Sequence, residues 1–566
     1  MTEAQHAQAP DVAAPLDLLL TQAALGARGG VMPLRPALAF ARALASRPRR
    51  VLTRATSWSG EMSRVALGSS TLAPTHRDRR FTDPAWTTNP LLRRLAQAYL
   101  ATGQAAEGLA QDVPMDWRDA ERVRFAVSNL VEALAPSNNP LTSPVAWKAA
   151  IDTGGLSAVR GLRNLVRDMS TAPRVPSMVD RAAFTVGQEL STTPGAVVLR
   201  TPVFELIQYA PTTDTVRREP LLIVPPTINK YYVLDLAPRR SLIEHLVGSG
   251  QQVFVVSWRN PDARHSKWGL DVYTQAVLDA LAAVRDISGE GRTHLLAACS
   301  GGILAALAAA HLAQTDQQGQ LASLTLLVTV LDQSRTGTTG AFIDEETAAA
   351  AIAQSRRKGY LDGRSLAEVF AWLRPADLIW NYWVNNYLEG KPPPAFDILA
   401  WNADTTRMTA RLHADFLRMA LSNALVRPGG ITVLGTEIDL KKVTVDSYVV
   451  AGVADHICPW QSCYRSTQLF GGTSRFVLST SGHIAALVNP PGNPKSSYSV
   501  AEEPVAASTD ATQWQLDAGK QPGTWWSDYV TWLAEHCTDE VPAPTSLGGQ
   551  EHRVLGAAPG SYVLDA

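Results

Sequence analysis

The amino-acid sequence predicts an α/β protein with a mostly parallel sheet, preceded by a mainly helical segment. From about residue 191 onward, short apolar segments alternate with helical ones, whereas earlier residues show only helical patterns. Strands that are apolar at every position are buried on both faces, and helices between them indicate parallel crossover connections. A chain of 566 residues is also long enough for two structural units.

The first part of the chain, residues 1–190, is expected to be a mainly helical N-terminal domain. Apolar side chains recur at spacings of three and four residues in 92–101 and 120–133. Turn-forming sequences such as Phe81-Thr82-Asp83-Pro84 separate the helical stretches. No strand-like alternation of any length occurs there.

The second part, residues 191–566, is expected to hold the sheet and the catalytic groups. Its apolar segments predict strands over residues 196–200, 205–209, 221–224, 252–257, 294–298, 324–331, 446–451 and 475–479. Helical patterns lie between them at residues 241–247, 272–287 and 302–313.

The alternation pauses at about residues 333–430, which predicts an insertion before the last two strands. This stretch is rich in Trp and Tyr, as in residues 380–387. Such aromatic side chains occur in lids that cover apolar substrates and equally in ordinary cores. The sequence leaves both interpretations open for these residues.

Charge and hydropathy exclude several function classes. The formal net charge of −1 gives no electrostatic case for a nucleic-acid partner or an anionic membrane surface. Residues 295–310 are small and apolar, but a spanning helix needs about 20 predominantly apolar residues. The N-terminus lacks the pattern of a signal peptide. We therefore expect a cytoplasmic protein with no transmembrane segment and no nucleic-acid partner.

Four cysteines, at positions 299, 458, 463 and 537, are too few for a disulfide framework in so long a chain. Cys458 and Cys463 lie near His456, but Cys-x4-Cys with one histidine matches no common zinc pattern. A fourth ligand is not evident either. We expect no metal site, and we interpret both cysteines as packing residues.

Cys299 is the predicted nucleophile. It lies in Ala297-Ala298-Cys299-Ser300-Gly301, a strand–turn–helix sequence typical of a nucleophile elbow, with Ala297 replacing the usual first glycine. The helix N-terminus favours a thiolate there, and the Ser300 N–H points where a tetrahedral oxyanion would form. Most unpaired cysteines are small buried apolar residues instead. The strand–turn–helix context favours the nucleophile.

Asp455 and His483 follow two later predicted strands, at the sheet edge where catalytic groups gather. The order nucleophile, acid, histidine is that of α/β-hydrolases, so the sequence predicts an α/β-hydrolase fold with a lid insertion. His483 is expected to take the thiol proton, while Asp455 orients the imidazole or acts as a separate base. His456 is a competing, auxiliary base.

With these residues in place, the chain resembles the polyhydroxyalkanoate synthases, bacterial polyester-forming enzymes. The family's catalytic cysteine, aspartate and histidine fall on Cys299, Asp455 and His483, and its histidine beside the aspartate falls on His456. Within the family, residues 298–302, 460–465 and 489–495 look most like the class II, medium-chain-length enzymes. The segments that carry the family resemblance are Phe81–Trp86, Val224–Tyr232, Ser257–Pro261, Trp380–Tyr387, Asp455–Trp460 and Ser481–Ile484.

The resemblance implies an acyltransferase that polymerises (R)-3-hydroxyacyl-CoA thioesters into intracellular polyester. CoA is released while Cys299 carries the acyl or polymer chain. The implied oxyanion donors are the backbone N–H groups of Ser300 and Ile228. The implied partners are the growing polyester, the granule surface and a second copy in a homodimer, with contacts through the N-terminal domain. No cofactor is expected, because no phosphate-binding loop or dinucleotide fingerprint is present.

Two other functions stay open from the sequence. One is a thioesterase or polyester depolymerase with the same three residues, in which water accepts the acyl group. The other is a catalytically idle granule-coat protein. The sequence also leaves open the acyl chain length, the oligomeric state, the number of cysteines that carry the chain, and the base that deprotonates the hydroxyl.

Overall fold

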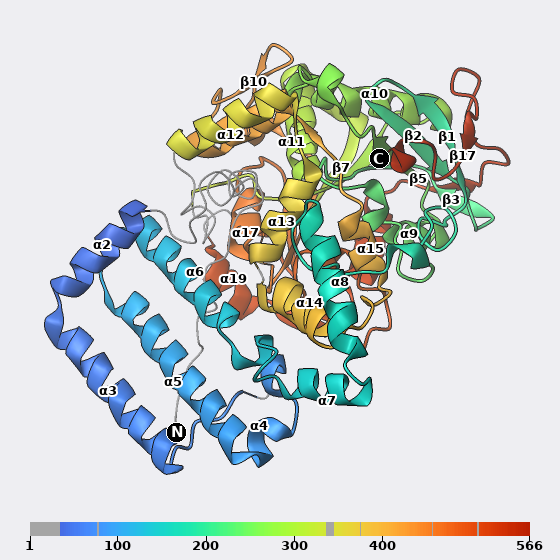
Figure 1. Cartoon of the computed structure of the whole chain (residues 1–566). Coiled ribbons are helices and arrows are strands. Elements are labelled where there is room, and N and C mark those ends of the chain that lie inside the picture. Colours follow the sequence, from blue (N-terminus) through green and yellow to red (C-terminus); the bar gives the residue numbers. More distant parts are fainter. Residues whose placement is uncertain are drawn as a thin grey trace. The chain divides into compact units, whose positions relative to one another are not determined.

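The computed structural model of the chain describes residues 34–75, 78–334, 345–373, 375–455, 457–506 and 509–565. They form two compact units. Figure 1 shows the chain coloured along the sequence, with the helices and strands labelled. The sheet unit comprises the described parts of Arg181–Gly363 and Asp397–Ala566. The helical unit comprises the described parts of Thr21–Asp180 and Arg364–Phe396.

The sheet unit contains an 11-stranded sheet among its described residues, in the order β15-β14-β13-β12-β7-β6-β4-β5-β2-β1-β17. The six central strands, β13 to β5 in this order, pair in parallel. The outer strands on both sides pair antiparallel. The predicted mostly parallel sheet is confirmed.

The elements of the sheet unit have the following bounds. The strands of the sheet are β1 (Gly195–Arg200), β2 (Phe204–Tyr209), β4 (Leu221–Val224), β5 (Val253–Trp258), β6 (Thr293–Ala298), β7 (Leu321–Leu327), β12 (Ser447–Gly452), β13 (Ser474–Ser479), β14 (Ser497–Val500), β15 (Gly519–Pro522) and β17 (Gly556–Ala557). Short pairs are β3 (Thr215–Arg217) with β16 (Glu540–Pro542), β8 (Tyr360–Leu361) with β9 (Met408–Thr409), and β10 (Thr432–Val433) with β11 (Thr436–Glu437). The helices are α9 (Leu242–Gly248), α10 (Leu270–Ser288), α11 (Ser300–Gln314), α12 (Glu345–Lys358), α15 (Asp397–Ala403), α16 (Ala410–Ser422), α17 (Trp460–Thr467), α18 (His483–Val488), α19 (Ala511–Asp517) and α20 (Trp525–Glu535).

The central strands form because their sequences are apolar at nearly every position. β4, β6, β7 and β12 are buried along their whole length, as expected for strands covered on both faces. The expected strand at residues 324–331 is partly wrong, because β7 ends at Leu327. Val328 has a φ of 43°, and the Leu331 N–H bonds to the Ser466 side chain at 2.9 Å instead of to a strand.

The described residues of the helical unit form α-, 3-10 and π-helices joined by turns and loops, with no β-strand among them. Its helices are α2 (Leu34–Ala45), α3 (Pro48–Leu67), α4 (Ala85–Thr88), α5 (Pro90–Asp112), α6 (Trp117–Ala133), α7 (Pro144–Asp152), α8 (Leu156–Ser170), most of α13 (Gly363–Leu373) and α14 (Asn381–Trp383), flanked by π-helical turns at Ala376–Trp380 and Val384–Leu388. The predicted helical character of the N-terminal region is confirmed. No described helix of the chain combines the length and apolar character needed to cross a membrane.

The aromatic stretch at residues 380–387 contributes to the interior of the helical unit. Trp380 and Trp383 meet edge to face with ring centroids 5.8 Å apart, and Trp383 meets Tyr387 at 5.1 Å. The Tyr387 hydroxyl donates to Asp168 on α8 at 3.0 Å. Ile379 packs with Val175 and other apolar residues in one buried cluster. These side chains therefore act as core residues of the helical unit.

Candidate active site

Cys299 lies at a sharp turn between β6 and α11. Its backbone has a φ of 52° and a ψ of −121°, and its N–H donates to the Leu327 carbonyl at 2.9 Å. A non-glycine residue in this region is strained by about 1–3 kcal/mol and persists only where the surroundings enforce it. The turn lifts the thiol above the carboxyl end of the strand and places it at the N-terminus of α11.

Small residues around Cys299 allow this turn. A Cβ at Gly301 would overlap the carbonyl oxygens of Val224 and Pro225, and one at Gly302 would overlap Thr329. Both glycines are therefore required by the close approach of α11 to the ends of β4 and β7. Ala297 is fully buried within β6. Its strand conformation explains why alanine is tolerated where the elbow pattern has glycine.

His483 and Asp455 are brought together by two neighbouring parallel strands. Asp455 follows the end of β12 and His483 begins α18 after β13. The two loops are joined by backbone bonds from Val453 N–H to Ser479 and from Ala454 N–H to Ser481. As a result, the Nδ1 of His483 lies 2.8 Å from Asp455 Oδ2, with both side chains buried.

The donor atoms of Cys299 and His483 lie within 4.8 Å of each other. Because Nδ1 of His483 is bonded to Asp455, its Nε2 is the nitrogen left for the sulfur. The structure thus brings together the three predicted residues Cys299, Asp455 and His483. His456, the predicted auxiliary base, lies outside the described residues.

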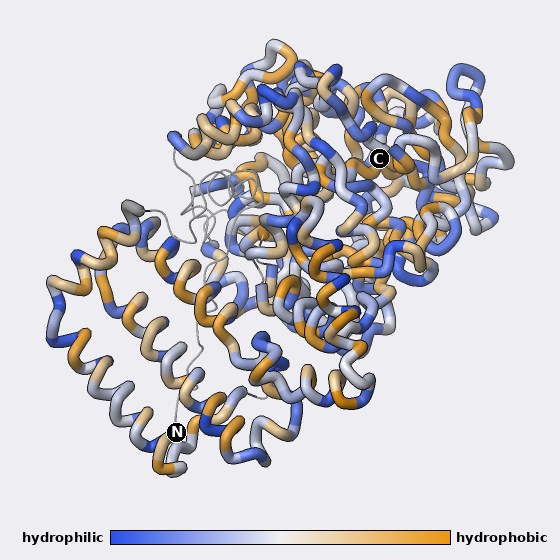
Figure 2. Tube along the Cα trace, viewed as in Figure 1, coloured by the Kyte–Doolittle hydropathy of each residue, from blue (hydrophilic) through white to orange (hydrophobic). Residues whose placement is uncertain are grey.

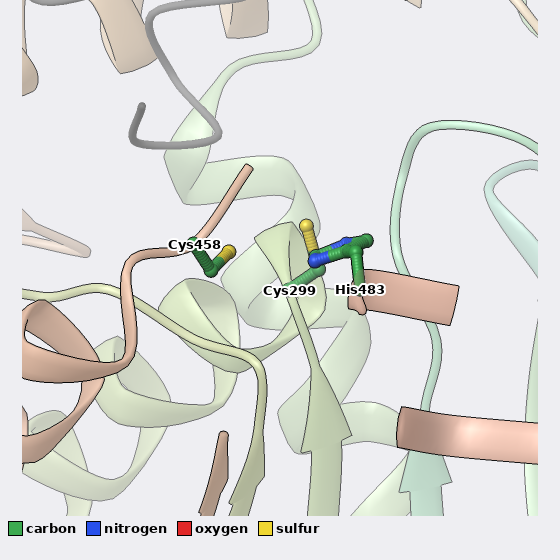
Figure 3. Close-up of side chains that lie close together, drawn as sticks. All are labelled: Cys299, Cys458 and His483. Atoms are coloured by element: carbon green, nitrogen blue, oxygen red, sulfur yellow. The ribbon is translucent and has the colours of Figure 1, made fainter. Parts of the chain in front are cut away.

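Cys458 also belongs to this group, and the sequence pattern did not predict its presence there. Its donor atom also lies within 4.8 Å of those of Cys299 and His483, and Figure 3 shows its sulfur pointing toward them. The cause is a turn in which Asp455 Oδ1 accepts from the N–H groups of Ile457 and Cys458, each at 2.8 Å. An aspartate that bonds to the backbone two and three residues later is a recognisable turn signal. Cys463 is buried but stands outside the group.

The surroundings of Cys299 favour its thiolate. Hydrogen bonding from the Cys458 thiol, opposed by burial and assisted by His483 and the Ser300 N–H, lowers the pKa of Cys299 to about 5. Burial alone would lower the pKa of His483, but Asp455 and Cys299 outweigh it and raise that pKa well above its usual value. The arrangement therefore favours a thiolate–imidazolium pair.

The loop after β4 lies beside the elbow. The Ser300 hydroxyl accepts from the Thr227 N–H at 2.9 Å and lies 3.1 Å from the Thr227 hydroxyl. Ile228 follows, half-buried, and its N–H has no hydrogen-bond partner in the part of the chain that is described. The Ser300 N–H is at the first residue of α11, where helix N–H groups lack intrahelical partners.

A separate cavity of about 940 Å³ lies in the helical unit. Arg80, Glu132 and Trp380 are among its lining residues. None of the predicted site residues lines it, so we do not place the active site there.

The elbow, the buried carboxylate–histidine pair and the parallel sheet define an α/β-hydrolase-type protein equipped for acyl transfer. Residues 220–490 match the family model of the alpha/beta hydrolase fold. Residues 77–246 match the model described as the N-terminus of poly-beta-hydroxybutyrate polymerase (PhaC). The predicted α/β-hydrolase fold, preceded by a helical N-terminal region, is confirmed.

Curated relatives match most of the chain. It is 47% identical over 504 residues to poly(3-hydroxyalkanoate) polymerase 1 of Ectopseudomonas oleovorans, covering 89% of each chain. It is 46% identical over 506 residues to polymerase 2 of the same organism, covering 89% of this chain and 90% of the relative. The polymerase subunit PhaC of Cupriavidus necator is 41% identical over 497 residues, covering 87% of this chain and 83% of that one. The chain belongs to the poly(3-hydroxyalkanoate) polymerase family, as the sequence resemblance predicted.

Proposed function

We propose that this chain polymerises (R)-3-hydroxyacyl-CoA thioesters with Cys299 as the nucleophile and CoA as the leaving group. One observation carries the residue assignment. A cysteine on a strained turn at a helix N-terminus lies within 4.8 Å of a histidine whose other ring nitrogen is held by a buried aspartate. Family membership supplies the reaction class, an acyl transfer that builds polyester.

In the first step, the Cys299 thiolate attacks the carbonyl carbon of the acyl-CoA thioester. The C–S bond to CoA breaks, and the CoA sulfur takes the proton from Nε2 of His483. The product is an acyl-Cys299 thioester with free CoA. Because one thioester replaces another, the exchange is close to balanced in energy and suits a thiol nucleophile better than a hydroxyl.

In the second step, the 3-hydroxyl of another acyl unit attacks an acyl thioester and forms the ester bond. His483 accepts the hydroxyl proton, and the thiolate that leaves is free for the next cycle. The 2.8 Å bond to Asp455 holds the imidazole with Nε2 toward Cys299 and stabilises its cationic form. This geometry favours His483 over Asp455 as the base.

The tetrahedral oxyanion in each step needs two donors near the elbow. We assign this role to the backbone N–H groups of Ser300 and Ile228. The Thr227–Ser300 bond fixes the loop beside the elbow, and the Ile228 N–H is free of partners among the described residues. Backbone donors fixed in this way stabilise developing charge without reorganisation.

We place the route to the site at the carboxyl edge of the sheet, where Cys299, Asp455 and His483 lie. The segment before and at the start of α16 is hydrogen-bonded to the loop between β5 and α10. The Arg407 N–H donates to the Asn260 side-chain oxygen at 2.9 Å, and the Arg411 N–H donates to the Ser266 carbonyl at 3.1 Å. We propose that this segment, which lies within the insertion predicted at about residues 333–430, acts as a lid. The domain division at residue 190 also remains a proposal.

An apolar face on α7 and α8 supports contact with a polyester surface. The side chains of Trp147, Ile151, Leu156, Val159, Leu162 and Val166 are each at least 58% exposed. Figure 2 shows hydrophobic and hydrophilic residues alternating along α8. Arginines 160, 163 and 167 lie on the same helix, and a helix with apolar and basic faces suits an interface. We propose that this face, the α7–α8 face, binds the granule in the cytoplasm.

The class II resemblance favours medium-chain 3-hydroxyacyl groups, and we propose these as the substrates. We also propose that the enzyme works as a homodimer without a second subunit type. CoA release across acyl chain lengths, with gas chromatography of the polymer made in cells, tests the chain length. Light scattering of the purified chain tests the dimer.

The reaction itself is tested with radiolabelled (R)-3-hydroxyacyl-CoA. We expect purified protein to release CoA and to convert the label into insoluble polymer, and Cys299→Ser to lose both. Cys463→Ser, another buried thiol outside the group, is the matched control and should retain both. Label recovered only as free hydroxy acid would identify a thioesterase, and no CoA release would identify an idle coat protein. Normal polymer from Cys299→Ser would contradict the nucleophile assignment.

A further inference from the structure

We propose that Cys299, Cys458 and His483 form a binding site for a soft divalent cation of the zinc class, which blocks the nucleophile reversibly. The sequence spacing suggested no such site, because the three residues come from three different loops. Zinc prefers thiolate and imidazole ligands, and sites with three protein ligands keep a fourth position open. Two cysteines and one histidine provide this ligand set.

The distances suit zinc after a small contraction. The three donor atoms lie within 4.8 Å of one another, and all three side chains are buried. Zn–S bonds of about 2.3 Å in a tetrahedron separate two sulfurs by about 3.8 Å. Figure 3 shows the Cys299 sulfur beside the His483 imidazole and the Cys458 sulfur directed toward these two side chains. Side-chain rotations that move each sulfur by less than 1 Å would bring the two sulfurs to the separation found in a zinc site.

The second observation is the aspartate behind the histidine. Histidines that bind zinc commonly donate the other ring N–H to a carboxylate, which fixes the ring and raises its basicity. The Nδ1 of His483 has this partner in Asp455, at 2.8 Å. Asp455 is in turn held by the N–H groups of Ile457 and Cys458. The same turn therefore orients the histidine and supplies the second sulfur.

Charge balance also fits. Without metal, the site holds the Cys299 thiolate, the His483 imidazolium and the Cys458 thiol, whose sulfur lies 2.8 Å from the Val328 carbonyl oxygen and donates to it. Binding Zn²⁺ to two thiolates and a neutral imidazole releases two protons and leaves the same net charge. The open fourth position would take water.

Metal binding and the proposed function are separable. Cation binding depends only on the three side chains, whereas inhibition rests on the proposed function, because the metal occupies the thiolate that attacks the acyl-CoA. If the protein binds zinc but releases no CoA, the metal site stands and the polymerase mechanism is contradicted. If the protein releases CoA but does not bind zinc through Cys458, the polymerase mechanism stands and the metal site is refuted.

The test uses the full chain with a phosphine reductant present, so that no disulfide forms. Co²⁺ is titrated first, and we expect thiolate-to-cobalt charge-transfer absorption and the visible bands of tetrahedral Co²⁺, both lost when Zn²⁺ is added. Equilibrium dialysis should give a tight zinc site, and zinc should stop CoA release until a chelator is added. Octahedral cobalt bands alone, or inhibition that no chelator reverses, would overturn the proposal.

Variants distinguish this site from adventitious binding. Cys458→Ser keeps the size and a donor toward Val328, and we expect it to weaken zinc binding by roughly 100-fold or more, since lost outer partners alone cost about 10–100-fold. Cys299→Ser should weaken zinc binding to a similar extent. It provides the test if Cys458→Ser fails to fold. Cys537→Ser, at a sulfur that contacts His294 instead, should bind zinc as the unchanged chain does. Unchanged zinc affinity in either of the first two variants would refute the site.

Discussion

The protonation state of the Cys299 thiol is determined by opposing effects. Burial disfavours the thiolate, while the Cys458 thiol, His483 and the Ser300 N–H favour it, and the favourable contributions prevail. The Cys458 thiol has one proton and two acceptors within reach, the Val328 carbonyl and the Cys299 sulfur. The strength of Cys299 as the proposed nucleophile therefore depends on a neighbour that is itself neutral, since burial and Cys299 raise the pKa of Cys458 well above its usual value.

This balance predicts the pH dependence of alkylation. With the pKa of Cys299 lowered to about 5, its thiolate persists at neutral pH and is lost only as the pH falls through that value. The rate of iodoacetamide modification at Cys299 should be half-maximal near pH 5, compared with about 8.5 for a free cysteine. Mass spectrometry of the modified peptide measures it.

Cys458→Ala removes the thiol donor and should move that midpoint upward, whereas Cys537→Ala should leave it unchanged, because the Cys537 sulfur contacts His294 instead. A midpoint at the value of free cysteine in the unchanged chain would show that the Cys299 thiolate is not favoured.

Asp455→Asn tests the orientation of the imidazole. The amide cannot stabilise the imidazolium and favours the wrong tautomer, so CoA release should fall by roughly 10²–10⁴-fold. Asp439→Asn is the control, because Asp439 also accepts from a backbone N–H, that of Lys441. Near-normal turnover in Asp455→Asn would remove Asp455 from the mechanism.

The residue assignments could be predicted only in part from the sequence. Cys299, Asp455 and His483 were found because each follows a predicted strand in the order expected of the fold. The sequence predicts only a packing role for Cys458, because a spacing pattern does not show that Asp455 turns the loop back toward the elbow. The nearness of Cys458 to Cys299 depends on contacts between loops far apart in the chain.

Among the elements, the contact between α11 and the end of β4 holds the elbow in place. Gly301 allows that contact, with its Cα facing the Val224 and Pro225 carbonyls. The same contact positions the Ser300 N–H beside the loop that carries Ile228. The elbow and the proposed oxyanion donors therefore depend on one helix–strand approach.

Gly301→Ala should disrupt this contact. The added Cβ overlaps both carbonyl oxygens, and such overpacking costs about 1–3 kcal/mol in the free energy of unfolding. Urea unfolding measures that cost, and CoA release should fall as well. Gly291→Ala is the control, because no atom lies within 4 Å of its Cβ position. Equal stability and activity of the two variants would show that the close approach is unimportant.

The sequence predicted the central strands well and the edge strands poorly. β4, β6 and β12 are continuous apolar runs with buried surroundings on both faces, so composition reveals them. β14 is half-buried along its length and β15 is exposed, so neither has such a run. Apolar residues beyond Leu327 resemble a strand, yet they form the loop that contacts Cys458 and α17.

For the whole molecule, we propose that the α7–α8 face contacts the polymer and that the chemistry takes place in the sheet unit. Val159 and Leu162 are 66% and 61% exposed on α8. Replacing both with glutamate should weaken cosedimentation with polyester granules by roughly tenfold or more, because buried apolar area drives such binding.

The initial rate of CoA release from soluble substrate should stay the same in this double variant. Leu516→Glu, at a side chain 77% exposed on α19, is the matched control and should bind granules normally. Undiminished granule binding by the double variant would place the contact surface elsewhere.

The central claim is that Cys299 carries the acyl chain during polymer synthesis. The most direct measurement is peptide mass spectrometry after rapid acid quenching of the protein with (R)-3-hydroxyacyl-CoA. The account predicts a hydroxyacyl mass on the peptide containing Cys299, in step with CoA release and growing into longer oligomers. An acyl group found on Cys458 or another residue, or polymer formed with Cys299 unmodified throughout, would contradict it.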